Sequence, residues 1–125
     1  IIGRELAQVI HSCALGCLDL APTLSFTEQC SACVVAAAAG YPHATRRGDP
    51  ITIQNESKSS VQIFHSATRY NEEGKLVTSG GRVLSIVAQA KDFEEAFNTA
   101  YNHMSFVDFN GIFYRSDIGH QVRNQ

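Results

Sequence analysis

An apolar stretch at residues 30–39, which stops at Gly40-Tyr41-Pro42, constrains the fold of this chain more than any other segment. A short apolar run that ends at turn residues is typical of a strand buried on both faces. Alanine favours helix, so the alanines of this run leave a helical segment as the alternative. The run is far shorter than the roughly 20 apolar residues that cross a bilayer, so no membrane is expected as a partner.

Other segments also carry a strand pattern. Residues 61–64 and 75–78 flank the turn sequence Asn71-Glu72-Glu73-Gly74, and we expect them to form two paired strands. Residues 82–88 are rich in β-branched side chains, which predicts a central strand. A shorter strand is expected at residues 111–115.

The most secure helix follows Asp92, which forms a capping-box-like pair with Glu95. Its apolar side chains recur at helical spacing: Phe93, Ala96, Phe97, Ala100, Tyr101 and Met104. A first helix is predicted from Leu6 to near Gly16. The predicted class is therefore α+β, with a mainly antiparallel sheet and one long amphipathic helix.

Less regular segments connect these elements. Residues 21–29 suit a connector or a weak edge strand. Residues 42–60 are polar and predict mostly loop, interrupted by a short alternating stretch at residues 51–53.

Composition limits the class of protein. The chain has 125 residues, is 44% hydrophobic and carries a formal net charge of -2. A chain of this size can bury a core within a single domain. Because there is no basic excess, no nucleic acid is expected as a partner. The chain begins at Ile1, with neither an initiator Met nor a signal pattern, and is interpreted as a piece of something longer.

Four cysteines form two close pairs that could suggest a structural zinc site: Cys13, Cys17, Cys30 and Cys33. The odd separation of the second pair on a strand would point its side chains to opposite faces. Buried free thiols are the favoured interpretation, with zinc and disulfides as the alternatives.

Gly80-Gly81-Arg82 is the strongest candidate binding motif. Paired glycines let a ligand approach the backbone, and a guanidinium leaving a rigid strand can hold a carboxylate or phosphate through two hydrogen bonds. The alternative is a tight turn followed by a structural salt bridge.

Two weaker candidates lie elsewhere. Arg46 and Arg47 could contact a phosphate from a loop, or simply be solvated. The Arg47-Gly48-Asp49 tripeptide occurs often by chance and is not interpreted as an adhesion motif. His65, at a strand end, could donate, accept or ligate, although it has no histidine or cysteine partner at ligand spacing. We expect no catalytic residue and no metal ligand in this chain, because no complete catalytic motif is present.

Several motifs together resemble one known family, glycinamide ribonucleotide synthetase (phosphoribosylamine–glycine ligase), an ATP-grasp enzyme. The resemblance covers about residues 30–120 and the C-terminal domain of that enzyme only. It rests on Gly40-Tyr41-Pro42, Arg47-Gly48-Asp49, Phe64-His65, Val77-Thr78-Ser79-Gly80-Gly81-Arg82-Val83-Leu84, the 93–100 helix and Phe113-Tyr114-Arg115-Ser116-Asp117-Ile118-Gly119-His120.

This resemblance implies a cytoplasmic enzyme of purine biosynthesis, in which ATP activates glycine's carboxylate and phosphoribosylamine attacks through its amine to give glycinamide ribonucleotide. ATP and Mg²⁺ would be held by preceding ATP-grasp domains, so this fragment alone is expected to be inactive and to bind neither. Residues 1–20 would be the final helix of that region, and residues 21–125 the C-terminal domain, similar to that of biotin carboxylase.

The resemblance also implies that Gly80, Gly81 and Arg82, with Arg46, Arg47 and His65, wall the substrate cleft. The competing interpretation is a non-catalytic packing or interaction domain of a multifunctional purine-synthesis protein. The sequence departs from the family pattern at His43 and Ala67, where the family has glycine. If the glycine at 67 served an unusual backbone angle, the turn here must differ.

Overall fold

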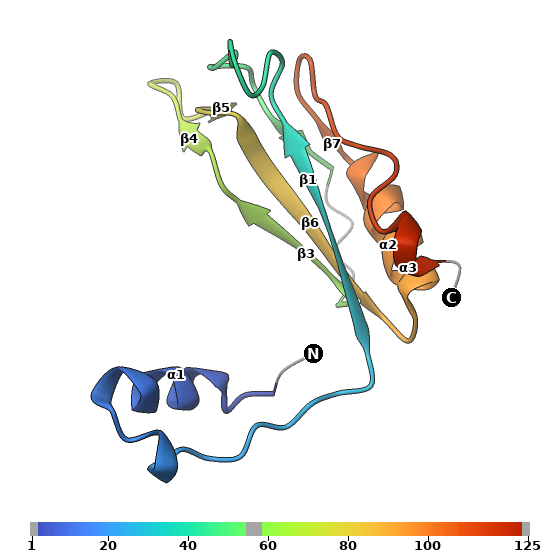
Figure 1. Cartoon of the computed structure of the whole chain (residues 1–125). Coiled ribbons are helices and arrows are strands. Elements are labelled where there is room, and N and C mark those ends of the chain that lie inside the picture. Colours follow the sequence, from blue (N-terminus) through green and yellow to red (C-terminus); the bar gives the residue numbers. More distant parts are fainter. Residues whose placement is uncertain (1–2, 55–58, 124–125) are drawn as a thin grey trace.

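A three-stranded antiparallel sheet forms the centre of the computed structural model, which describes residues 3–54 and 59–123 (Figure 1). Its strands are β1 (Cys30–Ala37), β6 (Arg82–Ala90) and β3 (Val61–His65), in the order β1-β6-β3. The β-branched segment thus becomes the central strand, as predicted. Every paired strand in the described part of the chain runs antiparallel.

Helix α2 (Phe93–Met104) covers one face of this sheet (Figure 1). The Asp92 side chain accepts a hydrogen bond of 2.8 Å from the Glu95 backbone N–H, which confirms the predicted helix start. The core lies between α2 and the sheet, and its buried residues include Val34, Ala36, Leu84, Ile86, Ala88, Ala96, Phe97, Ala100 and Met104.

The prediction that β1 is buried on both faces is wrong. Its side chains alternate, with Ala32 and Val34 buried and Cys33 and Val35 exposed. The reason is that α2 packs on one face only, and no described element covers the other to the same extent.

Two small ribbons flank the main sheet: β2 (Thr52–Ile53) pairs with β7 (Val107–Asp108), and β4 (Thr68–Tyr70) pairs with β5 (Leu76–Thr78). The hairpin turn forms at residues 71–74, as predicted. Asn71 Oδ1 accepts hydrogen bonds from the backbone N–H groups of Glu73 and Lys75.

The predicted pairing of residues 61–64 with residues 75–78 is wrong. After His65 the chain still bonds to β6 through Ser66 N–H and Ala67 N–H, so β3 stays on the main sheet. Residues 68–70 then turn away and provide the second strand of the hairpin.

The predicted strand at residues 111–115 is reduced to one bridge. Phe113 exchanges backbone hydrogen bonds of 2.7 and 2.9 Å with Ala37, and no longer ladder forms there. A short helix, α3 (His120–Arg123), forms in the tail that follows, for which no helix was predicted.

The N-terminal segment stands apart from the sheet (Figure 1). Helix α1 (Leu6–Leu15) ends at Gly16, whose φ of 71° allows the left-handed cap, and is followed by the 3-10 helix η1 (Leu18–Leu20). Neither contains a buried residue. Residues 21–29 form no named strand, which agrees with the expectation of a connector rather than that of an edge strand.

All four cysteines are free, but none is buried: Cys13 and Cys33 are exposed, and Cys17 and Cys30 are half-buried. The expectation of buried thiols is therefore wrong. Cys13 lies on α1, which has no buried residue, and β1 presents Cys33 on its uncovered face.

Candidate functional site

The Gly80-Gly81-Arg82 turn lies where β1 ends and β6 begins. Ala38 N–H donates to Gly81 O at 2.8 Å, and Ala67 N–H donates to Arg82 O at 3.0 Å. The turn is thereby tied to two segments on opposite sides of β6. Arg82 thus leaves a backbone whose position is set by a hydrogen-bonded ladder.

A surface hollow of about 600 Å³ opens beside this turn. Arg82 is exposed and is the one arginine among the described residues that line the hollow. Within residues 3–54 and 59–123, Arg82 makes no side-chain hydrogen bond or ion pair, so its positive charge is free for a ligand. The other lining residues are Val35, Tyr41, Pro42, Thr45, Ser66, Ala67, Gly81 and Ser85.

The space beside each of the two glycines is occupied by a side chain of the same chain. The space a Cβ would need at Gly81 is taken by the ring of Tyr41, with Cε2 at 2.8 Å. At Gly80 the same space is limited by the Ala67 methyl group, at 2.9 Å. Neither glycine has a positive φ, so close packing rather than backbone conformation explains these glycines.

A second, mostly apolar hollow of about 200 Å³ adjoins the first, because Val35, Tyr41 and Arg82 line both. It is completed by Cys33, Ala37, Phe113, Tyr114, Arg115 and Ile118. The Phe113–Ala37 bridge brings this C-terminal segment to the edge of the sheet.

Arg115 at this hollow is already paired. Its Nε and Nη2 donate to the two carboxylate oxygens of Asp117 at 2.9 and 2.6 Å. These hydrogen bonds raise the pKa of Arg115 and lower the pKa of Asp117. Tyr101 fixes the segment to α2, since its hydroxyl donates to Arg115 O and accepts from Ile118 N–H. Arg115 is therefore less available to an anionic ligand than Arg82.

The two arginines of the loop differ in environment. Arg46 Nη2 lies 2.7 Å from the buried carboxylate of Asp49, so its charge is already paired. Arg47 is exposed. The loop reaches the larger hollow through Thr45.

His65 is exposed at the end of β3, and its Nδ1 lies 3.0 Å from Thr68 Oγ1. The next residue, Ser66, lines the larger hollow. The six predicted residues thus belong to segments that meet at one end of the sheet. Of these six, Gly81 and Arg82 line the hollow themselves.

Sequence reasoning missed the polar and aromatic lining of the hollow, above all Tyr41, Ser66 and Ser85. Tyr41 was noticed only as part of a turn. No local pattern links Tyr41 to Gly81, since pairing of β1 with β6 brings the two together. At the departures His43 and Ala67 the backbone is ordinary, because no described non-glycine residue has a positive φ.

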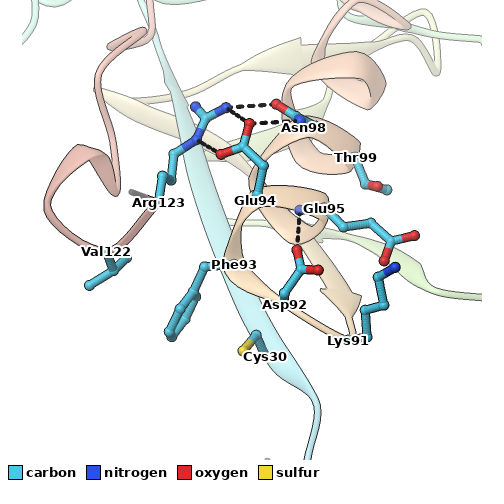
Figure 2. A pocket seen from close by; sticks show the side chains of 10 residues that line it. All are labelled: Cys30, Lys91, Asp92, Phe93, Glu94, Glu95, Asn98, Thr99, Val122 and Arg123. Atoms are coloured by element: carbon cyan, nitrogen blue, oxygen red, sulfur yellow. Dashed lines mark hydrogen bonds and ion pairs between the residues drawn. The ribbon is translucent and has the colours of Figure 1, made fainter. Parts of the chain in front are cut away.

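A separate groove of about 730 Å³ lies between the start of α2 and α3 (Figure 2). Arg123 donates to both carboxylate oxygens of Glu94 and to Asn98 Oδ1. The Asp92 side chain already accepts from the first turn of α2 (Figure 2). The hydrogen bonds of Arg123 to Glu94 and Asn98 thus hold α3 on α2.

Among the described residues, no three His, Cys, Asp or Glu side chains gather into a group that could hold a metal ion. The described helices also include none with the length and hydropathy needed to cross a membrane.

Comparison with known proteins identifies the family. The family model for the phosphoribosylglycinamide synthetase C domain matches residues 31–121, which include the whole site described above. The chain belongs to this family. A phosphoribosylamine–glycine ligase from Synechocystis is 38% identical over 98% of this chain. A bifunctional purine biosynthetic protein from Schizosaccharomyces pombe is 36% identical over 99% of it.

The crystal structure of a phosphoribosylamine–glycine ligase from Thermotoga maritima has the same fold as this C domain, with a TM-score of 0.73 and 31% identity over 91% of the chain. The chain spans 27% of that enzyme, 29% of the Synechocystis relative and 16% of the S. pombe relative. The α+β class predicted from the sequence is confirmed by this similarity.

Proposed function

We propose that this C domain is part of an ATP-dependent ligase that joins glycine to phosphoribosylamine and yields glycinamide ribonucleotide. The single observation that carries the proposal is the family match over residues 31–121, supported by relatives named phosphoribosylamine–glycine ligase. The reaction belongs to purine biosynthesis, and one relative is a bifunctional purine biosynthetic protein. The proposed location is the cytoplasm.

In this proposal Arg82 holds an anionic group of a substrate, a carboxylate or a phosphate. Its guanidinium is exposed beside a hollow and has no ion-pair partner among the described residues. A planar guanidinium can donate two parallel hydrogen bonds to such a group. Gly80 and Gly81 set the backbone from which it leaves. Arg46 and Arg47 contribute from a neighbouring loop, and His65 contributes from the end of β3.

ATP supplies the phosphoryl group that activates glycine, and Mg²⁺ neutralises the transferring phosphates in reactions of this type. We assign both to the preceding ATP-grasp part of the ligase, since the described residues offer no metal-binding cluster. This C domain then contributes binding and orientation of substrate.

We further propose that residues 1–20 are the last helix of that preceding part, and that the domain proper is residues 21–125. Helix α1 has no buried residue, and its main contacts with another described element are with η1. Several large apolar side chains there are exposed, including Ile10, Leu15, Leu18 and Leu20. Such a surface is explained by burial against another part of the ligase.

A second candidate function is packing alone, in which the domain steadies the ATP-grasp core or joins neighbouring domains. The observation that favours it is the uncovered face of the sheet, where Val35, Tyr41, Phe64, Phe113 and Tyr114 are all exposed. Large apolar side chains gathered on one face mark an interaction surface.

The two functions are separated by replacing Arg82 with lysine in the full-length ligase. The lysine keeps the charge but loses the two-pronged contact, so we expect binding of the anionic substrate to weaken by about 1 to 3 kcal/mol. If the contact stabilises the bound substrate and the transition state equally, its loss raises KM for glycine or phosphoribosylamine and leaves kcat unchanged. Arg69→Lys, on the exposed hairpin, is the control and should leave both constants unchanged.

A lowered melting temperature with unchanged kinetic constants would favour the packing function instead. The coding sequence upstream of this chain gives an independent test. An intact nucleotide-binding region there supports the ligase, and its absence contradicts it.

A further inference from the structure

Tyr41 is the aromatic residue most closely connected with the Gly80-Gly81-Arg82 turn. Its ring covers Gly81, so that a Cβ at position 81 would overlap Cδ2 and lie 2.8 Å from Cε2 and 3.3 Å from Cγ. Tyr41 and Arg82 also line both hollows, which places the ring at the boundary between the polar and the apolar one.

The backbone of residues 38–44 presents this ring to the turn. Tyr41 N–H donates to Ala38 O at 3.2 Å, and Ala38 N–H in turn donates to Gly81 O at 2.8 Å. Ala44 N–H closes the loop on Gly40 O, and Gly40 has a φ of 77°. Tyr41 and Gly81 are therefore held together by a hydrogen-bonded link as well as by ring packing.

We propose that Tyr41 is a positioning residue for Arg82, and this inference rests on the proposed role of Arg82 in binding an anionic group. Glycine has the largest conformational freedom of any residue, and Gly81 immediately precedes Arg82. The ring restricts that freedom by occupying the side of Gly81 that a side chain would otherwise fill. Because Gly81 has no side chain, the Tyr41 ring can pack against its backbone. This packing fixes the backbone conformation immediately before Arg82.

The contact is made by ring carbons. Among the described residues, the Tyr41 hydroxyl takes part in no hydrogen bond, and a phenylalanine would present the same ring edge to Gly81. The proposal therefore distinguishes the ring from the hydroxyl. Loss of the ring should release the turn, whereas loss of the hydroxyl should not.

The experiment measures KM and kcat of the full-length ligase for Tyr41→Ala, Tyr41→Phe and Gly81→Ala. If the Arg82 orientation that binds substrate falls to about one-tenth of the population, KM rises about ten-fold while kcat holds. We expect this for Tyr41→Ala, and also for Gly81→Ala, whose methyl group displaces the ring. Tyr41→Phe should behave as the wild type. Tyr70→Ala, which removes an exposed tyrosine of the hairpin, is the control and should leave both constants unchanged.

A double variant tests whether Tyr41 acts through Arg82. Once Arg82 is lysine, the further change Tyr41→Ala should raise KM less than about two-fold, because coupled residues are not additive. A full additive effect, or an unchanged KM for Tyr41→Ala alone, would overturn the positioning role. These results differ from failure of the proposed function itself, in which Arg82→Lys alone leaves KM unchanged.

Discussion

Arg46 and Asp49 form an ion pair in which the acid is buried and the base is not. Arg46 Nη2 lies 2.7 Å from Asp49 Oδ1, and the side chains are 52% and 5% exposed. The Asp49 backbone N–H also donates to the Thr78 hydroxyl at 3.1 Å. The buried carboxylate itself depends on Arg46, because its removal from water is otherwise unfavourable and its second oxygen, Oδ2, has no hydrogen-bond partner among the described residues. The pair therefore anchors the loop that follows Pro42.

Asp49→Asn should lower the free energy of unfolding of the 125-residue chain by about 1 kcal/mol, since it removes the charge that pairs with the half-exposed Arg46. Chemical denaturation of the purified chain measures the change. Arg47→Ala, at an exposed neighbour, should shift it by less than about 0.5 kcal/mol. Equal effects of the two substitutions would show that the buried pair has no special role.

The Glu94–Arg123 pair should make stability depend on pH in the acid range. Hydrogen bonds, first from Arg123 and then from Asn98, hold the pKa of Glu94 below its ordinary value of 4.5. Because the folded-state pKa is lowered, the stabilisation is present above pH 4.5 and is lost as the pH falls through that lower pKa.

The measurement is the difference in Tm between the wild type and Glu94→Gln from pH 7 downwards. That difference should shrink below pH 4.5, as the wild-type carboxylate becomes protonated. Glu95→Gln is the matched control, since Glu95 lies on the same exposed turn and forms no ion pair among the described residues. A difference that persists undiminished at the lowest pH would contradict the role of the ionised pair.

Ile86 and Val87 are neighbours on β6 that point to opposite faces of the sheet. Ile86 is fully buried under α2, whereas Val87 is half-buried on the uncovered face. In the isolated chain, Ile86→Ala should cost about 2 to 5 kcal/mol of unfolding free energy, and Val87→Ala distinctly less. Cooperative thermal unfolding of the wild type is expected as well. A comparable loss at both positions would mean that the second face is also packed.

The isolated chain should bind Mg²⁺-ATP only negligibly and show no ligase activity. The described residues provide neither a metal-binding cluster nor a phosphate-binding glycine loop of the P-loop pattern. Isothermal titration calorimetry with Mg²⁺-ATP tests this directly. Micromolar binding would place part of the nucleotide site within this domain.

Local patterns in the sequence were sufficient for most of the elements. The Asp92 cap and the apolar stripe behind it predicted α2, and β-branched residues predicted β6 as the central strand. Both signals act between residues close in the chain, where backbone geometry sets which side chains share a face. Pairing of strands is not local in this sense. Strand β5 therefore pairs with residues 68–70, a segment too short to show a strand pattern in the sequence.

For the candidate site, the sequence by itself determined the motif, since Gly80-Gly81-Arg82 stands out by residue type. Only the tertiary structure decided how the motif is used, because Tyr41 reaches Gly81 through strand pairing between distant segments. The same holds for burial: the apolar run predicted a strand buried on both faces, but α2 packs on one face only and thereby determines which side chains of β1 are buried. Periodicity is a property of neighbouring residues, whereas burial and close contact depend on what the folded chain places opposite them.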